Sequence, residues 1–367
     1  MKIKIYNEFS KELIGIWQDL ENNGSSSVFQ RLSWVLNWYD TIGWPIHQCN
    51  LCIVSITSKN KVVAILPMGI KKIGFIKKLE WLGGIHSDYM GPILSASSED
   101  VLGDIEVIWP KIVKYLPTYD ILYLDKQIPQ VNRCANPFFG MKNSTQITSS
   151  HQAKLDNNWE DYTNTVSKKV LNDNVRQRRR LSSLGSLTYS TLKGNAEDEN
   201  LFFEKLFLFK SARYKEMGVE DVLKQDEHRK FYQKMPSQIS QSSRVHCSIL
   251  KLDEEIIALH WGVVDMNIFY YLMPAYSSKN WSKYSPGKIL LEDLMVSCKE
   301  NGINVFDFTS GDEPYKKIWS NDSFPIALTI RSNSIKGNAY IIFLNFKGWL
   351  SQFALLKKIF KKIFNKT

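Results

Sequence analysis

Two stretches far apart in the chain share one pattern, and this repeat restricts the possible folds more than any other feature of the sequence. Residues 52–70 (CIVSITSKNKVVAILPMGI) alternate apolar and small side chains, turn at 58–60 and alternate again, which predicts a β-hairpin. Residues 247–264 do the same around positions 252–255. When the second strands are aligned without gaps, VVAIL of the first stretch meets IIALH of the second.

The same further elements follow each predicted hairpin. In the first half, a helical pattern around 105–115 precedes an apolar strand at 121–125. In the second half, a helix around 287–299 precedes a strand at 303–308. The order hairpin, helix, strand predicts a mixed α/β fold of two tandem lobes, each a largely antiparallel sheet flanked by helices. Chance similarity between two ordinary hairpins is the alternative.

The 367 residues are enough for two such lobes. A polar stretch without periodicity near 150–160 predicts lobes at 1–155 and 156–334, followed by a tail at 335–367. In the tail, Phe353, Leu356, Phe360 and Ile363 form one helical stripe flanked by lysines. This pattern predicts a basic amphipathic helix that lies on anionic lipid or a membrane-bound partner, or else packs on the body of the protein.

Charge and cysteine content narrow the class of protein. Lys and Arg number 47 against 37 Asp and Glu, a net charge of +10 that favours anionic partners, although no motif points to a specific nucleic acid. The five cysteines show no disulfide spacing, no secretion signal is visible, and no run of about 18 apolar residues occurs, so we expect a cytoplasmic protein, peripheral at most to the membrane. Cys49 and Cys52 near His47 lack a second ligand pair, so we expect no metal site.

A turn that opens the second-half helix suits an anion. In YSPGKILLEDL (284–294), Ser285 can cap the helix, Pro286 fixes φ, Gly287 permits close approach and Lys288 adds positive charge. The corresponding first-half segment, LSASSEDVLGDIE, is acidic and would repel an anion. Ordinary helix capping is the alternative, and no Walker, Gly-x-Gly-x-x-Gly or Gly-x-Ser-x-Gly motif occurs.

Several polar residues are candidates for chemistry or for binding the acceptor. Strand alternation places His260 on one face with two small residues, where it is either a base or a hydrogen-bonded structural histidine. Asp312 and Glu313, with Tyr315 and Lys316, form a second cluster that is also a good helix start. His86 and Asp88, in a Gly-rich segment, either line a cleft between the lobes or belong to an ordinary turn. Arg176 and Arg180 share a helix face that either grips an acceptor phosphate or is solvated.

Residues 284–294, followed by FDFTSGDEPYKKIW (306–319), resemble the C-terminal signature of bacterial acetyltransferases of the cellulose-biosynthesis type, the BioF-like branch of the GNAT superfamily. Weaker resemblances extend over 29–40, 81–94, 176–190 and 210–218, and the tail lies outside them. The resemblance implies a tandem GNAT fold in which the second lobe binds acyl-coenzyme A, with 284–288 (Tyr284 to Lys288) as the pyrophosphate loop. The superfamily's usual Gln/Arg-x-x-Gly-x-Gly/Ala pattern is absent.

The same resemblance implies roles for individual residues. Met273 and Ala275, on the strand at 268–276, would lie beside pantetheine. Tyr315 would protonate the leaving thiolate, while Asp312 or Glu313 would orient the acceptor or act as base. The expected reaction is transfer of an acetyl or other acyl group from acyl-coenzyme A to an amine or hydroxyl, on a small or glycan-linked acceptor of surface-polysaccharide biosynthesis. A Fem-type transferase that uses aminoacyl-tRNA, or a non-catalytic scaffold, are the alternatives.

Overall fold

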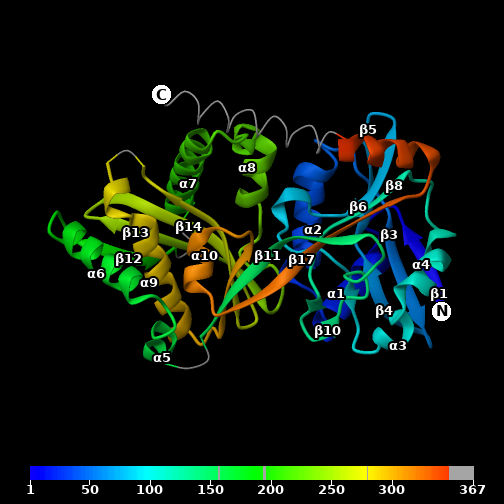
Figure 1. Cartoon of the computed structure of the whole chain (residues 1–367), viewed down its shortest axis with the longest axis horizontal. Helices are drawn as coiled ribbons and strands as arrows, with labels where there is room; N and C mark the ends of the chain where they lie inside the picture. Colours follow the sequence, from blue (N-terminus) through cyan, green and yellow to red (C-terminus); the bar gives the residue numbers. More distant parts are fainter. Residues whose placement is uncertain (156–157, 193–195, 279, 347–367) are drawn as a thin grey trace, which may run out of the picture.

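The computed structural model describes residues 1–155, 158–192, 196–278 and 280–346, arranged as two lobes side by side (Figure 1). Both predicted hairpins are present, β3 (Ile53–Ser58) with β4 (Lys61–Leu66) and β13 (Ser243–Leu252) with β14 (Glu255–Asp265). Their tight turns contain left-handed residues, Lys59 and Asn60 in the first and Asp253 in the second, with φ of 46°, 62° and 51°.

The N-terminal lobe surrounds its hairpin with short helices and further strands. Its other elements are β1 (Lys2–Tyr6), α1 (Lys11–Asn23), η1 (Val28–Gln30), α2 (Leu32–Trp38), η2 (Tyr39–Gly43), β2 (Asn50–Leu51), β5 (Met68–Ile73), β6 (Ile76–Trp81), η3 (Gly84–His86), β7 (Ile93–Leu94), α3 (Glu99–Leu102), α4 (Ile105–Val113) and β8 (Ile121–Gln127). Side chains cap its main helices, since Ser10 accepts from Leu13 N at the start of α1 and Asp104 accepts from Glu106 N at the start of α4.

The second half continues through two small strands into the larger lobe. Its other elements are β9 (Gln130–Val131), β10 (Cys134–Ala135), β11 (Ser144–Lys154), α5 (Trp159–Thr163), α6 (Lys168–Ser182), β12 (Leu187–Thr191), α7 (Ala196–Met217), η4 (Val222–Lys224), α8 (Asp226–Gln233), β15 (Ile268–Tyr276), η5 (Ser282–Tyr284), α9 (Pro286–Glu300), β16 (Val305–Ser310), α10 (Pro314–Trp319) and β17 (Asp322–Ser332). The predicted order of hairpin, helix and strand is therefore present in both halves.

One long sheet runs through both lobes. Its eleven strands lie in the order β12-β13-β14-β15-β16-β11-β17-β8-β6-β5-β2, whereas β1-β3-β4-β7 form a separate four-stranded sheet. The strand β17, near the end of the chain, pairs antiparallel with both β11 and the N-terminal β8, and Figure 1 shows it crossing between the lobes. The mixed α/β class with two helix-flanked lobes is confirmed, while the continuity of the sheet was not predicted.

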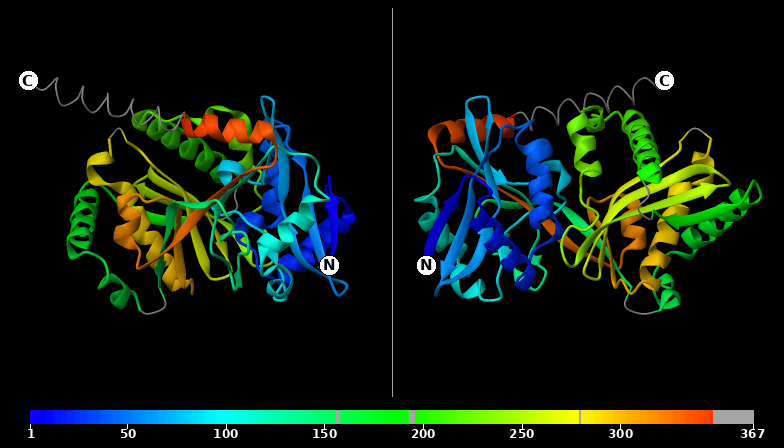
Figure 2. Two further views of the ribbon diagram at one scale, coloured as in Figure 1. Left: turned by 45° about the vertical axis from the view of Figure 1, so that its right-hand side comes forward. Right: turned by 180° about the vertical axis from the view of Figure 1, so that it is seen from behind.

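Helices cover both faces of the larger lobe. Figure 2 shows α7 and α8 on one face of the sheet and α6 with α9 on the other. Helix α7 packs on β14 and β15, and α9 packs on β13, β14 and β15. The strand β15 is therefore buried between two helices, and its loop leads directly into α9.

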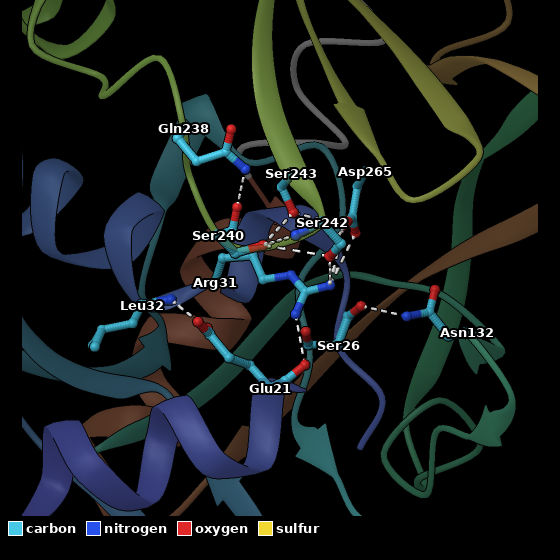
Figure 3. Close-up of polar contacts among 10 residues, drawn as sticks. All are labelled: Glu21, Ser26, Arg31, Leu32, Asn132, Gln238, Ser240, Ser242, Ser243 and Asp265. Carbon is cyan, nitrogen blue, oxygen red and sulfur yellow. Dashed lines mark hydrogen bonds and ion pairs between the residues drawn. The ribbon is translucent and has the colours of Figure 1, made fainter. Parts of the chain in front are cut away.

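A buried polar network joins the two lobes (Figure 3). Arg31, at the start of α2, donates from Nη2 to Asp265 Oδ1 at the end of β14 over 3.0 Å. Its Nη1 donates to the Glu21 carbonyl at 2.6 Å, and Ser243 Oγ donates to Asp265 Oδ1 at 2.6 Å. Because charges buried this deeply need partners, the network fixes the position of one lobe against the other.

The predicted tail is described only in part. Residues 335–346 are helical and begin beside Asp120 on the N-terminal lobe, where the Ser334 hydroxyl donates to the Asp120 carboxylate at 2.6 Å. The stripe predicted at Phe353 to Ile363 lies outside the described residues. Across the described ranges, no helix is both long and apolar enough to cross a bilayer.

Candidate active site

The two parallel strands at the centre of the larger lobe separate from one another. β15 and β16 are paired from Ile268 with Val305 to Tyr270 with Asp307, and β15 then continues to Tyr276 without β16 as a neighbour. On its other side, β15 stays paired with β14 as far as Tyr276, so only the edge toward β16 is open. Unpaired main-chain groups on such an edge can bind an extended ligand that carries amides.

A bulge in the neighbouring pairing accompanies this separation. The β14–β15 register shifts between Trp261 and Val263, at Gly262. A Cβ on Gly262 would lie 2.5 Å from the Tyr270 carbonyl oxygen, so only glycine fits here. Of the predicted cofactor contacts on β15, Met273 and Ala275 are both buried in the apolar cluster shared with α7.

The predicted anion turn lies at the open end of β15. Ser285 is left-handed (φ 52°), its side chain does not cap the helix, and its carbonyl instead accepts from Lys288 N and Ile289 N. Pro286 has no N–H, so the Gly287 N–H is the one amide of this first turn without an acceptor among the described residues. A Cβ on Gly287 would lie 3.1 Å from the Tyr276 ring, so the backbone here approaches β15 closely.

The arginines of α6 gather at this same turn. Arg176 Nη2 lies 2.6 Å and Lys288 Nζ 3.5 Å from the Asp173 carboxylate, and the Arg180 guanidinium sits 4.8 Å from the centre of the Tyr284 ring. The two arginines predicted to hold an acceptor therefore surround the predicted donor loop instead. They place positive charge where a helix N-terminus already favours an anion.

A second polar cluster follows the end of β16. Lys316 is 5% exposed, and its Nζ donates to the Ser310 carbonyl at 2.6 Å and lies 3.1 Å from the Glu313 carboxylate. Gly311 makes this possible, because a Cβ on it would lie 2.5 Å from the Glu313 carboxylate. The structure thus brings a carboxylate and an ammonium together next to the separated strands.

Tyr315 completes this cluster from α10. Its ring packs edge-on against Phe308 and Tyr271, with centroids 6.2 and 6.5 Å apart. Burial, with the negative charges of Glu313 and Asp88, raises the pKa of Tyr315 far above its usual value. The phenol therefore keeps its proton and can act as a donor.

Lys210 on α7 is a site residue that the sequence analysis did not identify. Its Nζ donates to the Pro274 carbonyl on β15 at 3.3 Å, and burial lowers its pKa to about 8. The negative charges of Asp88 and Glu313 oppose this shift. Asp88 is half-buried in a bend that follows η3. Lys210 opens the segment KSARYKEMG, but a lysine in a helix pattern suggests an exposed side chain, so only the packing reveals its burial.

Asp312 faces away from this cluster toward β11. Its carboxylate accepts from Thr148 Oγ1 at 2.8 Å and Ser149 N at 3.3 Å, and lies 3.1 Å from His151 Nε2. These hydrogen bonds, that of Thr148 first, hold the pKa of Asp312 far below its usual value. A carboxylate so stabilised is a poor base, and it anchors the loop that carries Glu313.

His260 lies in the core and not in the polar cluster. It is fully buried, its Nε2 accepts from Leu272 N at 3.2 Å, and its ring stacks on Tyr271 with centroids 4.4 Å apart. Burial holds its pKa well below the usual value, so it is neutral. Tyr271 also contacts Tyr315 edge-on, so His260 can influence the phenol of the cluster through that ring.

Asp307 on β16 is buried and fully engaged in hydrogen bonds. It accepts from Tyr89 Oη at 2.6 Å, Gln152 Nε2 at 2.8 Å and Thr309 N at 2.7 Å, and burial raises its pKa to about 6. Thr309 has a φ of 61°, which is rare for a β-branched residue. The backbone is therefore strained where β16 leads into the polar cluster.

No metal centre is found in the part of the chain that the structure describes, where no three His, Cys, Asp or Glu side chains gather as ligands. Cys49 and Cys52 are buried, and burial raises the pKa of both thiols to about 12.

Comparisons with known proteins agree with this geometry. Residues 168–317, which include α6, the separated strands and the polar cluster, match the family described as acetyltransferase (GNAT) domain. No curated protein matches the chain. The expected GNAT-type domain is thus found in the second half, whereas the narrower cellulose-biosynthesis branch is not identified.

Solved structures show the fold of the whole chain. FemX is similar at a TM-score of 0.58 and 10% identity, covering 93% of this chain and 99% of its own. L-PGS from Bacillus licheniformis is similar at 0.52 and 13% identity, with 94% and 98% covered. A conserved protein of unknown function from Bacteroides thetaiotaomicron is similar at 0.51 and 8% identity, with 90% and 99% covered. At these identities the likeness concerns the fold alone, and the GNAT match stays with residues 168–317.

Proposed function

We propose that the protein is an acyltransferase that moves an acyl group, acetyl in the simplest case, from acyl-coenzyme A to an amine or hydroxyl on a small or glycan-linked acceptor. The observation that carries this proposal is the separation of β15 from β16, which lies between a cationic helix start and a carboxylate–ammonium–phenol cluster. A thioester held along the open edge would join these two places.

The donor would be held by its phosphates and its amides. The Gly287 N–H and the charges of Lys288, Arg176 and Arg180 would face the phosphates, and the open edge of β15 would bind the pantetheine arm. Bound acyl-coenzyme A supplies an activated carbonyl, and the protein then has to orient an acceptor against it.

The polar cluster can move the two protons that the reaction requires. Glu313 accepts the proton of the acceptor as its nitrogen or oxygen forms the new bond to the carbonyl carbon. Lys316 and Lys210 stabilise the negative charge that develops on the carbonyl oxygen. As the carbon–sulfur bond breaks, Tyr315 donates its proton to the thiolate and recovers one from solvent.

Two of the candidate residues are given supporting roles. Asp312 anchors the loop, because its carboxylate is already held by three donors on β11. His260 positions Tyr271, on which its ring stacks.

A Fem-type transferase that takes its acyl group from aminoacyl-tRNA is the second candidate. It is favoured by the likeness of the whole chain to FemX and L-PGS, and by a helix start that offers a single free amide to a diphosphate. A non-catalytic scaffold, with contact to membrane machinery through residues 335–367, is the third.

Calorimetry with acetyl-coenzyme A tests the proposal. The wild-type protein should bind, and Gly287→Glu should abolish binding, because the new side chain brings a carboxylate and a clash with Tyr276 to the phosphate seat. Gly15→Glu is the matched control, since Gly15 is an exposed helical glycine with open space around it. If the wild-type protein does not bind acetyl-coenzyme A, this proposal is wrong, and binding of charged tRNA then separates the second candidate from the third.

A further inference from the structure

A cavity of about 390 Å³ lies in the N-terminal lobe, away from the donor loop. Its walls come from α2 and η2, from β5, β6 and β8, and from η3 of the N-terminal lobe, and from η4 and the His228 side chain of α8. Both lobes therefore contribute to it.

Three residues in the wall carry a buried nitrogen without a partner among the described residues. These are Trp38 Nε1, Trp81 Nε1 and His86 Nδ1, on side chains that are 2%, 2% and 8% exposed. Gly84 also lines the cavity, and a Cβ on it would lie 3.4 Å from Trp38 Nε1, which places this N–H at the wall. An indole N–H can only donate, so these groups need an acceptor that the protein does not supply.

The histidine can be a donor as well. His86 Nε2 lies 3.1 Å from His228 Nδ1, so one of these two nitrogens carries the shared proton. When His228 donates across the pair, the proton of neutral His86 is on Nδ1 and is available to a ligand.

The lysines that line the cavity differ in whether they have an ion-pair or hydrogen-bond partner. Lys78 pairs with Glu80, and Lys126 Nζ donates to the Ser87 carbonyl at 2.7 Å. Lys71 has no ion pair or hydrogen bond within the described ranges, and burial lowers its pKa. Among the lysines that line the cavity, Lys71 is therefore the cation available to a ligand. Of the carboxylates there, Asp125 accepts from Lys126 N at 2.8 Å and Glu220 is exposed.

Apolar side chains form much of the remaining wall, with Ile42, Ile46, Met90 and the ring of Tyr123, beside the polar His47 and Gln225. Such a mixture of unpaired donors, one free cation and apolar surface fits a small organic molecule that carries an oxyanion on a ring or apolar body. The buried atoms of the wall that lack a partner in the described residues are nitrogens that can donate, which favours an oxyanion over an ammonium.

We infer that this cavity binds a phosphate or carboxylate group of the acceptor. His86 lines the cavity, and Asp88, two residues later, acts electrostatically on Lys210 and Tyr315 in the transfer cluster. An acceptor anchored at its anion beside His86 would extend along this segment toward the transfer cluster. The assignment of the ligand as the acceptor rests on the proposed transfer, whereas the binding of an oxyanion does not.

Calorimetry at physiological salt tests this with glucose 1-phosphate, glucuronate and uncharged glucose on the full chain. At least one of the two anions should bind and glucose should not, and comparison of the two anions tells phosphate from carboxylate. Lys71→Gln should weaken anion binding about tenfold or more, and Trp38→Phe, which keeps the ring and removes the N–H, should weaken it about fivefold. Lys72→Gln, one residue along the same strand and exposed, should have no effect.

Gly287→Glu, which should abolish binding of acetyl-coenzyme A, should leave anion binding in the cavity intact. A failure of the cavity inference can therefore be distinguished from a failure of the donor proposal. The inference is wrong if neither anion binds, if glucose binds as well as the anions, if Lys72→Gln matches Lys71→Gln, or if Gly287→Glu removes the binding. Thermal melting of each variant shows that a loss is not caused by unfolding.

Discussion

Arg31 and Asp265 form an ion pair between the two lobes, with side chains that are 2% and 3% exposed and atoms 3.0 Å apart. Removing one partner leaves the other charge buried, so Arg31→Met should lower the free energy of unfolding by about 3 to 5 kcal/mol. Denaturant unfolding measures this. Lys4→Met, in the exposed Lys4–Glu12 pair, is the control and should have far less effect. Equal small effects would show that the pair does not hold the lobes together.

Asp307 should make stability depend on pH. Its pKa is raised by burial from the usual 3.8 to about 6, so the folded protein binds more protons than the unfolded chain between these values. Its contribution is fully present below pH 3.8 and is lost as pH rises through 6. Unfolding free energies of wild type and Asp307→Asn, measured from pH 4 to 7, should diverge over this range. Parallel curves would contradict the shift.

Glu313 and Asp312 should respond differently to substitution. Glu313→Gln removes the proposed base and should lower turnover about a hundredfold or more. Asp312→Ala frees the loop from β11 and should lower turnover without changing the shape of the pH–rate profile, because its carboxylate is charged throughout the working range. A thiol-release assay across pH measures both. A changed profile in Asp312→Ala would assign the proton transfer to Asp312.

Tyr315→Phe should slow thiol release and leave donor affinity unchanged. The ring still packs against Phe308 and Tyr271, but the proton for the departing sulfur is missing. The control is Tyr115→Phe, which changes an exposed tyrosine of the N-terminal lobe. Turnover and the affinity for acetyl-coenzyme A are compared between the two variants. Full activity of Tyr315→Phe would exclude the tyrosine as the proton donor.

The end of the chain should promote binding to anionic lipid. In the described part of the tail, Ile335, Ile342, Phe343 and Phe346 are between 55% and 88% exposed, and lysines follow them in the sequence. Co-sedimentation with vesicles that contain anionic lipid compares the full chain with a chain truncated after Ser334. Equal co-sedimentation of the two chains would contradict a role of the tail in lipid binding. Vesicles of neutral lipid are the control.

Local patterns predicted the elements well, because the signals lie within a few residues. Alternation around Lys59–Asn60 and Asp253 predicted both hairpins, and the Ser-Pro-Gly start of α9 was placed correctly. The capping role of Ser285 was not, since this residue is left-handed and uses its carbonyl. A sequence pattern therefore predicts where a helix starts more reliably than it predicts which groups form the hydrogen bonds there.

Tertiary relationships were beyond the same reasoning. The burial of Lys210 arises from α7 packing on β15, and neither element predicts the other. Arg180 lies beside Tyr284, and Arg176 pairs with the same aspartate as Lys288; both placements depend on how α6 lies against α9, which no periodicity encodes. The loops of the candidate site were therefore identified from the sequence, while Lys210 and the position of the two arginines at the donor loop were found only from the packing.

The pairing of β17 with both β11 and β8 has a consequence for how the protein can be divided. Expressing the two halves as separate chains would separate strands that are hydrogen-bonded to each other. Each half would then expose an unpaired edge strand that is prone to self-association. Both lobes should therefore fold in a single cooperative event. Substrates have to enter by movement of loops and side chains, because a hinge motion between the lobes would break the hydrogen bonds of the shared sheet.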